Sequence, residues 1–186
     1  ILFWGISNEI LIGGISQELV DAHHDLEKLC KELDPTRLST IAHVSATPTT
    51  GPMHHITDLE SYNHYFGWYG GKIEDNGPWM DKFHAENPDI CLGISEYGCE
   101  GIINWHSNTP QCKDYTEEYQ ALYHEYMAQA FEDRPWIWAS HVWNMFDFGC
   151  AARNEGGVAG RNNKGLVTID RKTRKDSFYV YQAYWS

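Results

Sequence analysis

Basic side chains are scarce in this 186-residue sequence, which has 14 Lys and Arg against 26 Asp and Glu and a net charge of −12. Nucleic-acid backbones and anionic membrane surfaces both favour proteins with a basic face. The sequence also lacks an apolar run long enough to cross a bilayer. We therefore expect neither a nucleic acid nor a membrane among the partners of this chain.

Paired cysteine motifs are absent as well. The five Cys residues form no C-x-x-C pair, so neither a disulfide framework nor a zinc knuckle is indicated. Cys99, His106 and Cys112 lie close together, and His54 is followed by His55, but neither spacing matches a metal template with a fourth ligand. No G-x-G-x-x-G or G-x-x-x-x-G-K-[ST] follows a predicted strand. We expect no metal and no cofactor.

An initial Met and a signal peptide are also lacking. The sequence opens on ILFWGISNE, an apolar run that stops abruptly at an amide and a carboxylate. A short run rich in Ile, Phe and Trp is typical of a buried strand, so we expect the chain to be a piece of a longer protein. The compartment of that parent stays open, with the cytoplasm slightly favoured.

Strand-like and helix-like segments alternate along the chain. Short runs rich in β-branched and aromatic residues predict strands, and apolar residues at three- and four-residue steps predict helices. The predicted strands cover 1–7, 38–44, 56–63, 90–95 and 136–144, and the predicted helices cover 17–33, 79–87, 115–133 and 176–185. Strand followed by helix, repeated, is typical of an α/β fold with a parallel sheet and right-handed crossovers.

Residues at the ends of the predicted helices support these boundaries. Pro78 and Pro88 bracket the second helix. Asp114 with Glu117 three residues later matches a capping box and predicts the start of the third helix, and Asp176 is the expected N-cap of the fourth.

Two of the predicted strands run directly into a glutamate. Glu9 follows the first strand, and Glu96 ends the strand that begins at Ile90. In parallel α/β folds the active site lies at the carboxyl ends of the strands. Two carboxyl groups facing each other across a cleft are what glycoside hydrolysis requires. A strand-terminal Glu can equally serve as a salt-bridge partner or a helix cap, so both interpretations stay open on this evidence.

Five sequence blocks carry a family resemblance. WGISNE, SYNHYFGWYGG, ISEYG, HVWNMFDFG and NNKGLVTIDRKTRKDSFYVYQAYWS occur in this order and cover nearly the whole chain. Together they resemble the family 2 glycoside hydrolases, the group of β-galactosidases, β-glucuronidases and β-mannosidases. The resemblance implies a partial (β/α)8 TIM barrel, about strands four to eight with their helices, so that residues 1–186 form a single incomplete catalytic domain.

The resemblance also implies roles for individual residues. Glu9 would be the general acid/base and Glu96 the nucleophile of a retaining exo-glycosidase that works by double displacement. Asn8 would hydrogen-bond the sugar's 2-hydroxyl, Tyr65 would donate a hydrogen bond to the nucleophile, and Asn63 would line the same pocket. A retaining mechanism predicts carboxyl groups about 5 Å apart.

Further residues are implied to bind the sugar. Trp143 would form a platform under the ring, although it can also be interpreted as barrel core, which is how we interpret Trp68 and Trp138. Asn162 and Lys164 resemble the element by which β-glucuronidases hold a substrate carboxylate, and a Lys charge suits that role. Similar endings occur in β-galactosidase-like sequences, and the basic stretch RKTRKD can be a solvated turn. We favour β-galactosides as substrates, with β-glucuronides as the alternative.

The family's barrel has eight strands, and this chain supplies about five of them. Unpaired sheet edges and an uncovered barrel interior are unfavourable in water. We therefore expect the fragment to associate with itself or to pair with the missing part of the barrel, and to have little or no hydrolase activity alone. A non-catalytic carbohydrate-binding segment is the competing interpretation of the aromatic-rich composition.

Overall fold

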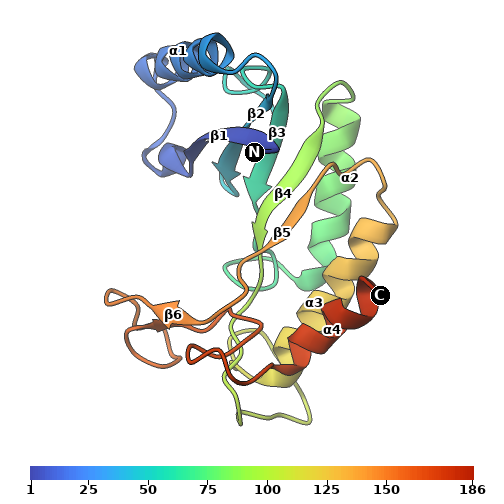
Figure 1. Ribbon diagram of the computed structural model, residues 1–186. Helices are drawn as coiled ribbons and strands as arrows, with labels where there is room; N and C mark the ends of the chain where they lie inside the picture. The colour runs from blue at the N-terminus through green and yellow to red at the C-terminus, as the bar shows by residue number, and fades with distance from the viewer. The chain divides into compact units, whose positions relative to one another are not determined.

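The computed structural model of the chain describes residues 1–186 and contains a five-stranded sheet with the order β1-β2-β3-β4-β5 (Figure 1). The pairs β1–β2 and β2–β3 are parallel. This order follows the chain, as successive right-handed strand–helix–strand units require. The predicted α/β fold with a parallel sheet is confirmed.

The elements match the predicted segments closely where the periodicity is strong. Helix α1 and strand β2 coincide with the predicted 17–33 and 38–44, whereas β3 and β5 are shorter than predicted. Strands β6 and β7 form a separate two-stranded antiparallel pair in the C-terminal part of the chain. The strands are β1 Phe3–Asn8, β2 Leu38–Val44, β3 Leu59–Asn63, β4 Leu92–Tyr97, β5 Ser140–Val142, β6 Phe148–Gly149 and β7 Arg161–Asn162. The helices are α1 Gln17–Leu33, α2 Asn76–Glu86, α3 Glu117–Glu132 and α4 Asp176–Tyr184, with short 3-10 turns at Ile10–Gly13 and Ile73–Asp75.

Two compact units share these elements. The first unit consists of Ile1–His64, Trp79–Ser95 and Trp136–Ser140, and the second of Tyr65–Pro78, Glu96–Pro135 and His141–Ser186. The first therefore contains α1, strands β1 to β3 and α2 from Trp79 onward, and the second contains the first three residues of α2, α3, α4 and the β6–β7 pair. The prediction that residues 1–186 form one domain stays a prediction.

The core of the first unit joins helix α1 to strands β1 and β2. Val20 of α1 and Ile41 of β2 are both buried, and Ile6 of β1 packs against the same cluster. The helix begins where the hydroxyl of Ser16 accepts a hydrogen bond from the backbone N–H of Leu19. Burial of one apolar face thus fixes α1 against the sheet.

Aromatic side chains hold helix α2 against strand β3 in the same unit. Tyr62 of β3 is fully buried, and its ring meets Trp79 and Phe83 edge-on at centroid distances of 5.0 and 5.6 Å. Edge-to-face pairs at such distances are favourable beyond their buried area. The face of β3 that carries Tyr62 is therefore the helix-covered face.

The leucines at the C-terminal end of α1 form an uncovered surface. Leu26, Leu29 and Leu33 are 41, 48 and 77% exposed, although their spacing predicts a buried stripe. With Trp4 and Ile6 they line a groove of about 560 Å³. Exposed apolar grooves of this kind are unfavourable in water. The expectation that the fragment associates with itself or pairs with the missing part of the barrel stays a prediction.

Helices α3 and α4 pack against each other in the second unit (Figure 1). Gln120 of α3 accepts a hydrogen bond from Ser177 of α4 at 2.9 Å. The Nδ1 atom of His124 lies 2.9 Å from the hydroxyl of Tyr181, which donates onward to the hydroxyl of Tyr97. This buried polar chain links the two helices to the end of β4.

The two predicted helix caps are wrong by one or two residues. Thr116 rather than Asp114 is the N-cap of α3, because its hydroxyl accepts from the N–H of Tyr119 at 3.2 Å. Asp114 instead accepts hydrogen bonds from the backbone and hydroxyl of Thr116. Helix α4 has Lys175 at the N-cap and Asp176 as its first residue.

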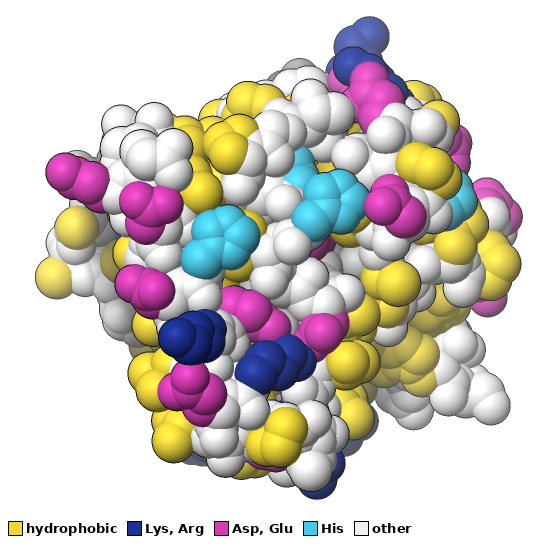
Figure 2. Space-filling model, turned by 90° about the horizontal axis from the view of Figure 1, so that it is seen from above, with side chains coloured by type: hydrophobic (Ala, Val, Ile, Leu, Met, Phe, Trp, Pro, Cys, Tyr) yellow, Lys and Arg dark blue, Asp and Glu magenta, His cyan; other side chains and the backbone are white.

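None of the helices combines the length and apolar composition needed to cross a bilayer. On the face drawn in Figure 2, the few Lys and Arg side chains are interspersed with Asp and Glu, and His side chains lie near the centre of the view. Charges of both signs therefore alternate on this face.

Candidate active site

One group of predicted site residues gathers at the carboxyl ends of β1 and β3, within the first unit. The amide nitrogen of Asn63 donates to Asn8 Oδ1 and to Glu9 Oε1, each at 3.0 Å. Asn63 is fully buried and Glu9 is half-buried. Glu9 has φ 54°, in the left-handed region, directly after strand β1 ends. This turn aims its carboxylate at the end of β3.

The Asn63 amide has a further partner. The hydroxyl of Ser95 donates to Asn63 Oδ1 at 2.7 Å, while the nitrogen of the same amide donates to Glu9. Asn63 therefore holds Glu9 through an uncharged donor, which is compatible with the acid/base role that the resemblance implies for Glu9.

A second group forms around Glu96 within the second unit. The hydroxyl of Tyr65 donates to Glu96 Oε2 at 2.6 Å. Burial and the nearby Glu96 carboxylate raise the pKa of Tyr65, so its hydroxyl stays protonated as a donor. A hydrogen bond to the ionised form of a carboxyl favours ionisation. Tyr65 is thus a protonated donor held against one oxygen of Glu96.

Lys164 is the most unusual cation of this group. Its side chain is 2% exposed, and its ammonium donates to the hydroxyl of Tyr69 at 2.6 Å. The carboxylate of Glu100 is the nearest anion, at 3.9 Å, which is too long for a hydrogen bond. Burial lowers the pKa of Lys164 to about 8. The buried charge is thus only partly compensated.

A network around Glu100 holds the segment that carries Lys164. Glu100 is 1% exposed, accepts from the backbone and side chain of Asn163, and pairs with Arg153 at 3.0 Å. Arg153 also donates to the hydroxyl of Tyr69. Asn162 accepts from the backbone N–H of Lys164 at 3.0 Å. Side-chain and backbone hydrogen bonds therefore hold the segment that carries Asn162 and Lys164 in place.

The basic stretch that follows is only partly solvated. Arg171, Lys172 and Arg174 are exposed, but Lys175 is fully buried. The ammonium of Lys175 donates to Asp147 at 2.7 Å and to two backbone carbonyls. A paired, fully hydrogen-bonded ion of this kind anchors the chain ahead of α4.

Trp143 lies at the end of β5 and is half-buried. Its backbone N–H donates to the carbonyl of Tyr97 at 2.8 Å, next to Glu96 in sequence, and its ring meets Phe148 edge-on. It also borders a hollow of about 600 Å³ that includes Asp147. The side chain of Trp143 is therefore not fully enclosed, and its role as a platform stays a prediction.

The structure thus brings the eight predicted residues into two sets. Asn8, Glu9 and Asn63 contact one another in the first unit, and the second unit holds Tyr65 on Glu96 together with Trp143, Asn162 and Lys164. Sequence analysis missed Tyr69, Glu100 and Arg153. Tyr69 lies in a quoted block four residues after Tyr65, which is the one signal that could have identified it. The other two are far apart in sequence and carry no spacing signal.

Comparison with known proteins identifies one family. The family described as "Glycosyl hydrolases family 2, TIM barrel domain" matches residues 1–186. A β-glucuronidase of Bacteroides fragilis is 39% identical over 191 residues, covering 100% of this chain and 27% of that protein. The human β-glucuronidase is 28% identical over 205 residues, again covering 100% of this chain and 28% of the relative.

Solved structures agree with this result. A structure described as an FMN-binding β-glucuronidase from Facaelibacterium prausnitzii L2-6 is 93% identical with a TM-score of 0.98, and the match covers 100% of this chain and 29% of that one. A putative β-galactosidase from Bacteroides fragilis is 35% identical with a TM-score of 0.91, covering 100% and 28%. The chain therefore spans less than a third of the length of these relatives.

Proposed function

Because the chain belongs to glycosyl hydrolase family 2, as part of its TIM barrel domain, we propose that it supplies both catalytic carboxylates of a retaining β-glucuronidase. The curated relatives named above are β-glucuronidases, which supports the alternative substrate class of the sequence analysis over the favoured β-galactosides. The whole protein's activity is part of this proposal, since the chain covers only 27–29% of the relatives' length.

The proposed reaction is a double displacement. Glu96 attacks the anomeric carbon while the leaving-group oxygen takes a proton from Glu9, which breaks the glycosidic bond and forms a covalent glycosyl–enzyme. Glu9, now ionised, removes a proton from water, and the resulting oxygen nucleophile displaces Glu96. The sugar leaves with its original anomeric configuration, and both carboxyl groups return to their starting states.

The buried ammonium of Lys164 is the observation that carries the substrate class. Its charge is balanced only at 3.9 Å by Glu100, while Tyr69 gives it a neutral acceptor. A uronic acid carboxylate placed against this ammonium would supply a second, closer anion and raise the lowered pKa of Lys164 again. A neutral galactoside carries no group that does this, so it gains nothing from the charge.

The test compares two substrates in two variants. We expect the native protein to have a higher kcat/KM for a nitrophenyl β-D-glucuronide than for the matching β-D-galactoside. Lys164→Ala should lower the glucuronide value about 100-fold and leave the galactoside value nearly unchanged, because a desolvated charged hydrogen bond is worth about 3 kcal/mol. Lys172→Ala, which removes an exposed Lys of the same part of the chain, is the control and should change neither.

Either of two results would contradict the proposal: a native preference for the galactoside, or an equal loss on both substrates in Lys164→Ala. The expectation that this chain alone has little activity still stands as a prediction. Where the 186 residues give no turnover, the same variants are compared in a protein that supplies the remaining strands of the barrel.

A further inference from the structure

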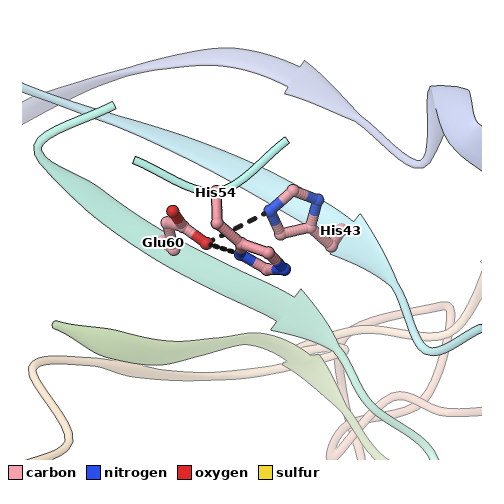
Figure 3. A group of neighbouring side chains, drawn as sticks. All are labelled: His43, His54 and Glu60. Atoms are coloured by element: carbon pink, nitrogen blue, oxygen red, sulfur yellow. Dashed lines mark hydrogen bonds and ion pairs between the residues drawn. The ribbon is translucent and has the colours of Figure 1, made fainter. Parts of the chain in front are cut away.

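Two histidines and a glutamate form a buried cluster on the helix-covered side of the first unit. His43 comes from β2, Glu60 from β3, and His54 from the loop between these strands (Figure 3). Their exposed fractions are 1, 1 and 6%, and their ligand-capable atoms all lie within 4.8 Å of one another. None of the three belongs to the proposed active site, and Glu60 lies on the same face of β3 as Tyr62, the face that α2 covers.

The two ring nitrogens of His54 both face oxygen atoms that accept hydrogen bonds. Its Nε2 atom lies 3.0 Å from the carbonyl of Pro48, which can only accept, so Nε2 carries the proton. Its Nδ1 atom faces the carboxylate of Glu60, which also only accepts when ionised. In the neutral imidazole two lone pairs would face each other there. Either a second proton or a metal ion must therefore occupy that position.

His43 separates these two possibilities. Neither of its ring nitrogens makes a hydrogen bond, although its side chain is completely buried. Its Nε2 atom points at the same Glu60 Oε2 atom from 3.5 Å, as Figure 3 shows. A proton on His54 would satisfy the contact between His54 and Glu60, but it would add nothing to Nε2 of His43, which lies beyond the usual hydrogen-bond distance from Glu60. One cation between the three side chains would engage Nδ1 of His54, Nε2 of His43 and the carboxylate of Glu60. Nδ1 of His43 has no partner in either case.

We propose that His43, His54 and Glu60 bind a divalent cation of the zinc class. Two imidazoles and a carboxylate are the ligands that zinc accepts, and the carbonyl of Pro48 fixes the His54 tautomer as second partners of metal ligands do. Ligand atoms on a tetrahedral zinc lie about 3.4 Å apart, close to the separation of His43 and Glu60. The contact between His54 and Glu60 is tighter, so the carboxylate moves outward when the ion binds.

Such an ion would tie the loop between β2 and β3 to both strands. The loop begins after Val44 and ends at Leu59, and β3 then leads to Asn63, which holds Glu9. Glu60 already fixes the loop once, because its Oε1 accepts from the backbone of His55 at 2.6 Å. The ion would thus hold the loop to both strands, and none of its three ligands belongs to the proposed active site.

The test measures metal content and stability of the purified protein. After chelator treatment and reloading with Zn²⁺, we expect one zinc per chain by elemental analysis and a melting temperature raised by about 5 °C. Loading with Co²⁺ should give visible absorption bands of a four- or five-coordinate ion. Both signals should be lost in His43→Gln and Glu60→Gln, and kept in His24→Ala, which removes an exposed histidine of α1.

Measuring the zinc content of each folded variant distinguishes loss of the metal site from a general loss of stability. A folded native protein that retains no zinc after reloading, and whose melting temperature does not respond to the ion, would overturn the proposal in favour of a protonated His54. Undiminished binding in the folded His43→Gln protein would also overturn it, because the ion would then lie at a surface site.

Discussion

The two regions that hold the proposed catalytic glutamates differ in kind. Around Glu9 the partners are amides and a hydroxyl: Asn63 donates to the carboxylate, and the hydroxyl of Ser95 donates to that amide. Around Glu96 the second unit gathers a phenol and, beyond it, a buried ammonium whose neighbours are Glu100 and Arg153. The first environment offers only uncharged hydrogen-bond donors, and the second contains buried charged side chains.

This difference fits the two roles that carboxyl groups have in a retaining glycosidase, the acid/base and the nucleophile. An acid/base must cycle between protonated and ionised forms, so a fixed charge beside it would disfavour one half of the cycle. A nucleophile must stay ionised and the substrate must be held, so donors and cations belong beside it. The comparison leads to predictions in which changes in the two regions have different consequences.

The largest expected effect comes from exchanging each glutamate for its amide. Glu96→Gln should lower kcat at least about 10³-fold for every leaving group, because no nucleophile remains. Glu9→Gln should slow glycosyl transfer strongly for a poor leaving group such as an alkyl alcohol and much less for nitrophenolate, which hardly needs protonation. Pre-steady-state release of the aglycone from both substrate types distinguishes the two.

Similar dependence on leaving-group acidity in both variants would contradict the assignment. Glu74→Gln is the control, because that residue lies in the short turn before α2, outside both groups, and should leave both substrates unaffected.

A smaller effect concerns pH and depends on Lys164. Its pKa is lowered to about 8, so its charge is present below that value and is lost as the pH rises through it. We expect the KM for a glucuronide to rise about tenfold for each unit above pH 8, since only the charged form attracts the carboxylate. The KM for a galactoside should stay flat, which initial-rate measurements from pH 6 to 10 would check. Parallel changes in the two KM values would count against the role of Lys164.

The smallest effect is on stability and comes from His124 in α3. Burial lowers its pKa to about 3, whereas the unfolded chain binds that proton near the ordinary value of 6.5. The folded state is therefore stabilised above pH 6.5 and loses this contribution as the pH falls towards 3. His124→Asn keeps a donor for Tyr181 but cannot titrate, so its denaturant midpoint should depend less on pH in this window. An unchanged pH slope would contradict this assignment.

How far the sequence predicts this molecule depends on the range of the interactions. Helix α1 follows from its own periodicity and its Ser16 cap, so its bounds were predictable. The cap of α3 was not, because Asp114 and Thr116 are both capable acceptors and only the folded turn selects between them. The exposure of Leu33 could not be predicted either, since an apolar stripe along a helix does not show which other segment covers it.

The candidate site shows the same limit. Glu9 and Glu96 could be proposed from the sequence because each follows or ends a strand, and the local blocks around them resemble a family; their roles stay predictions. The burial and charged neighbours of Lys164 could not be predicted from the sequence, because they depend on Glu100 and Arg153, which lie in separate loops. The sequence alone favoured β-galactosides, whereas the curated relatives named above are β-glucuronidases.

Covalent trapping tests the central proposal most directly. The protein is incubated with a 2-deoxy-2-fluoro-β-D-glucuronyl fluoride and, in parallel, with the galactosyl analogue, and the labelled peptide is sequenced by mass spectrometry. We predict an adduct on Glu96 that forms much faster with the glucuronyl reagent, because Lys164 favours the carboxylate. An adduct on Glu9, or faster labelling by the galactosyl reagent, would contradict the account.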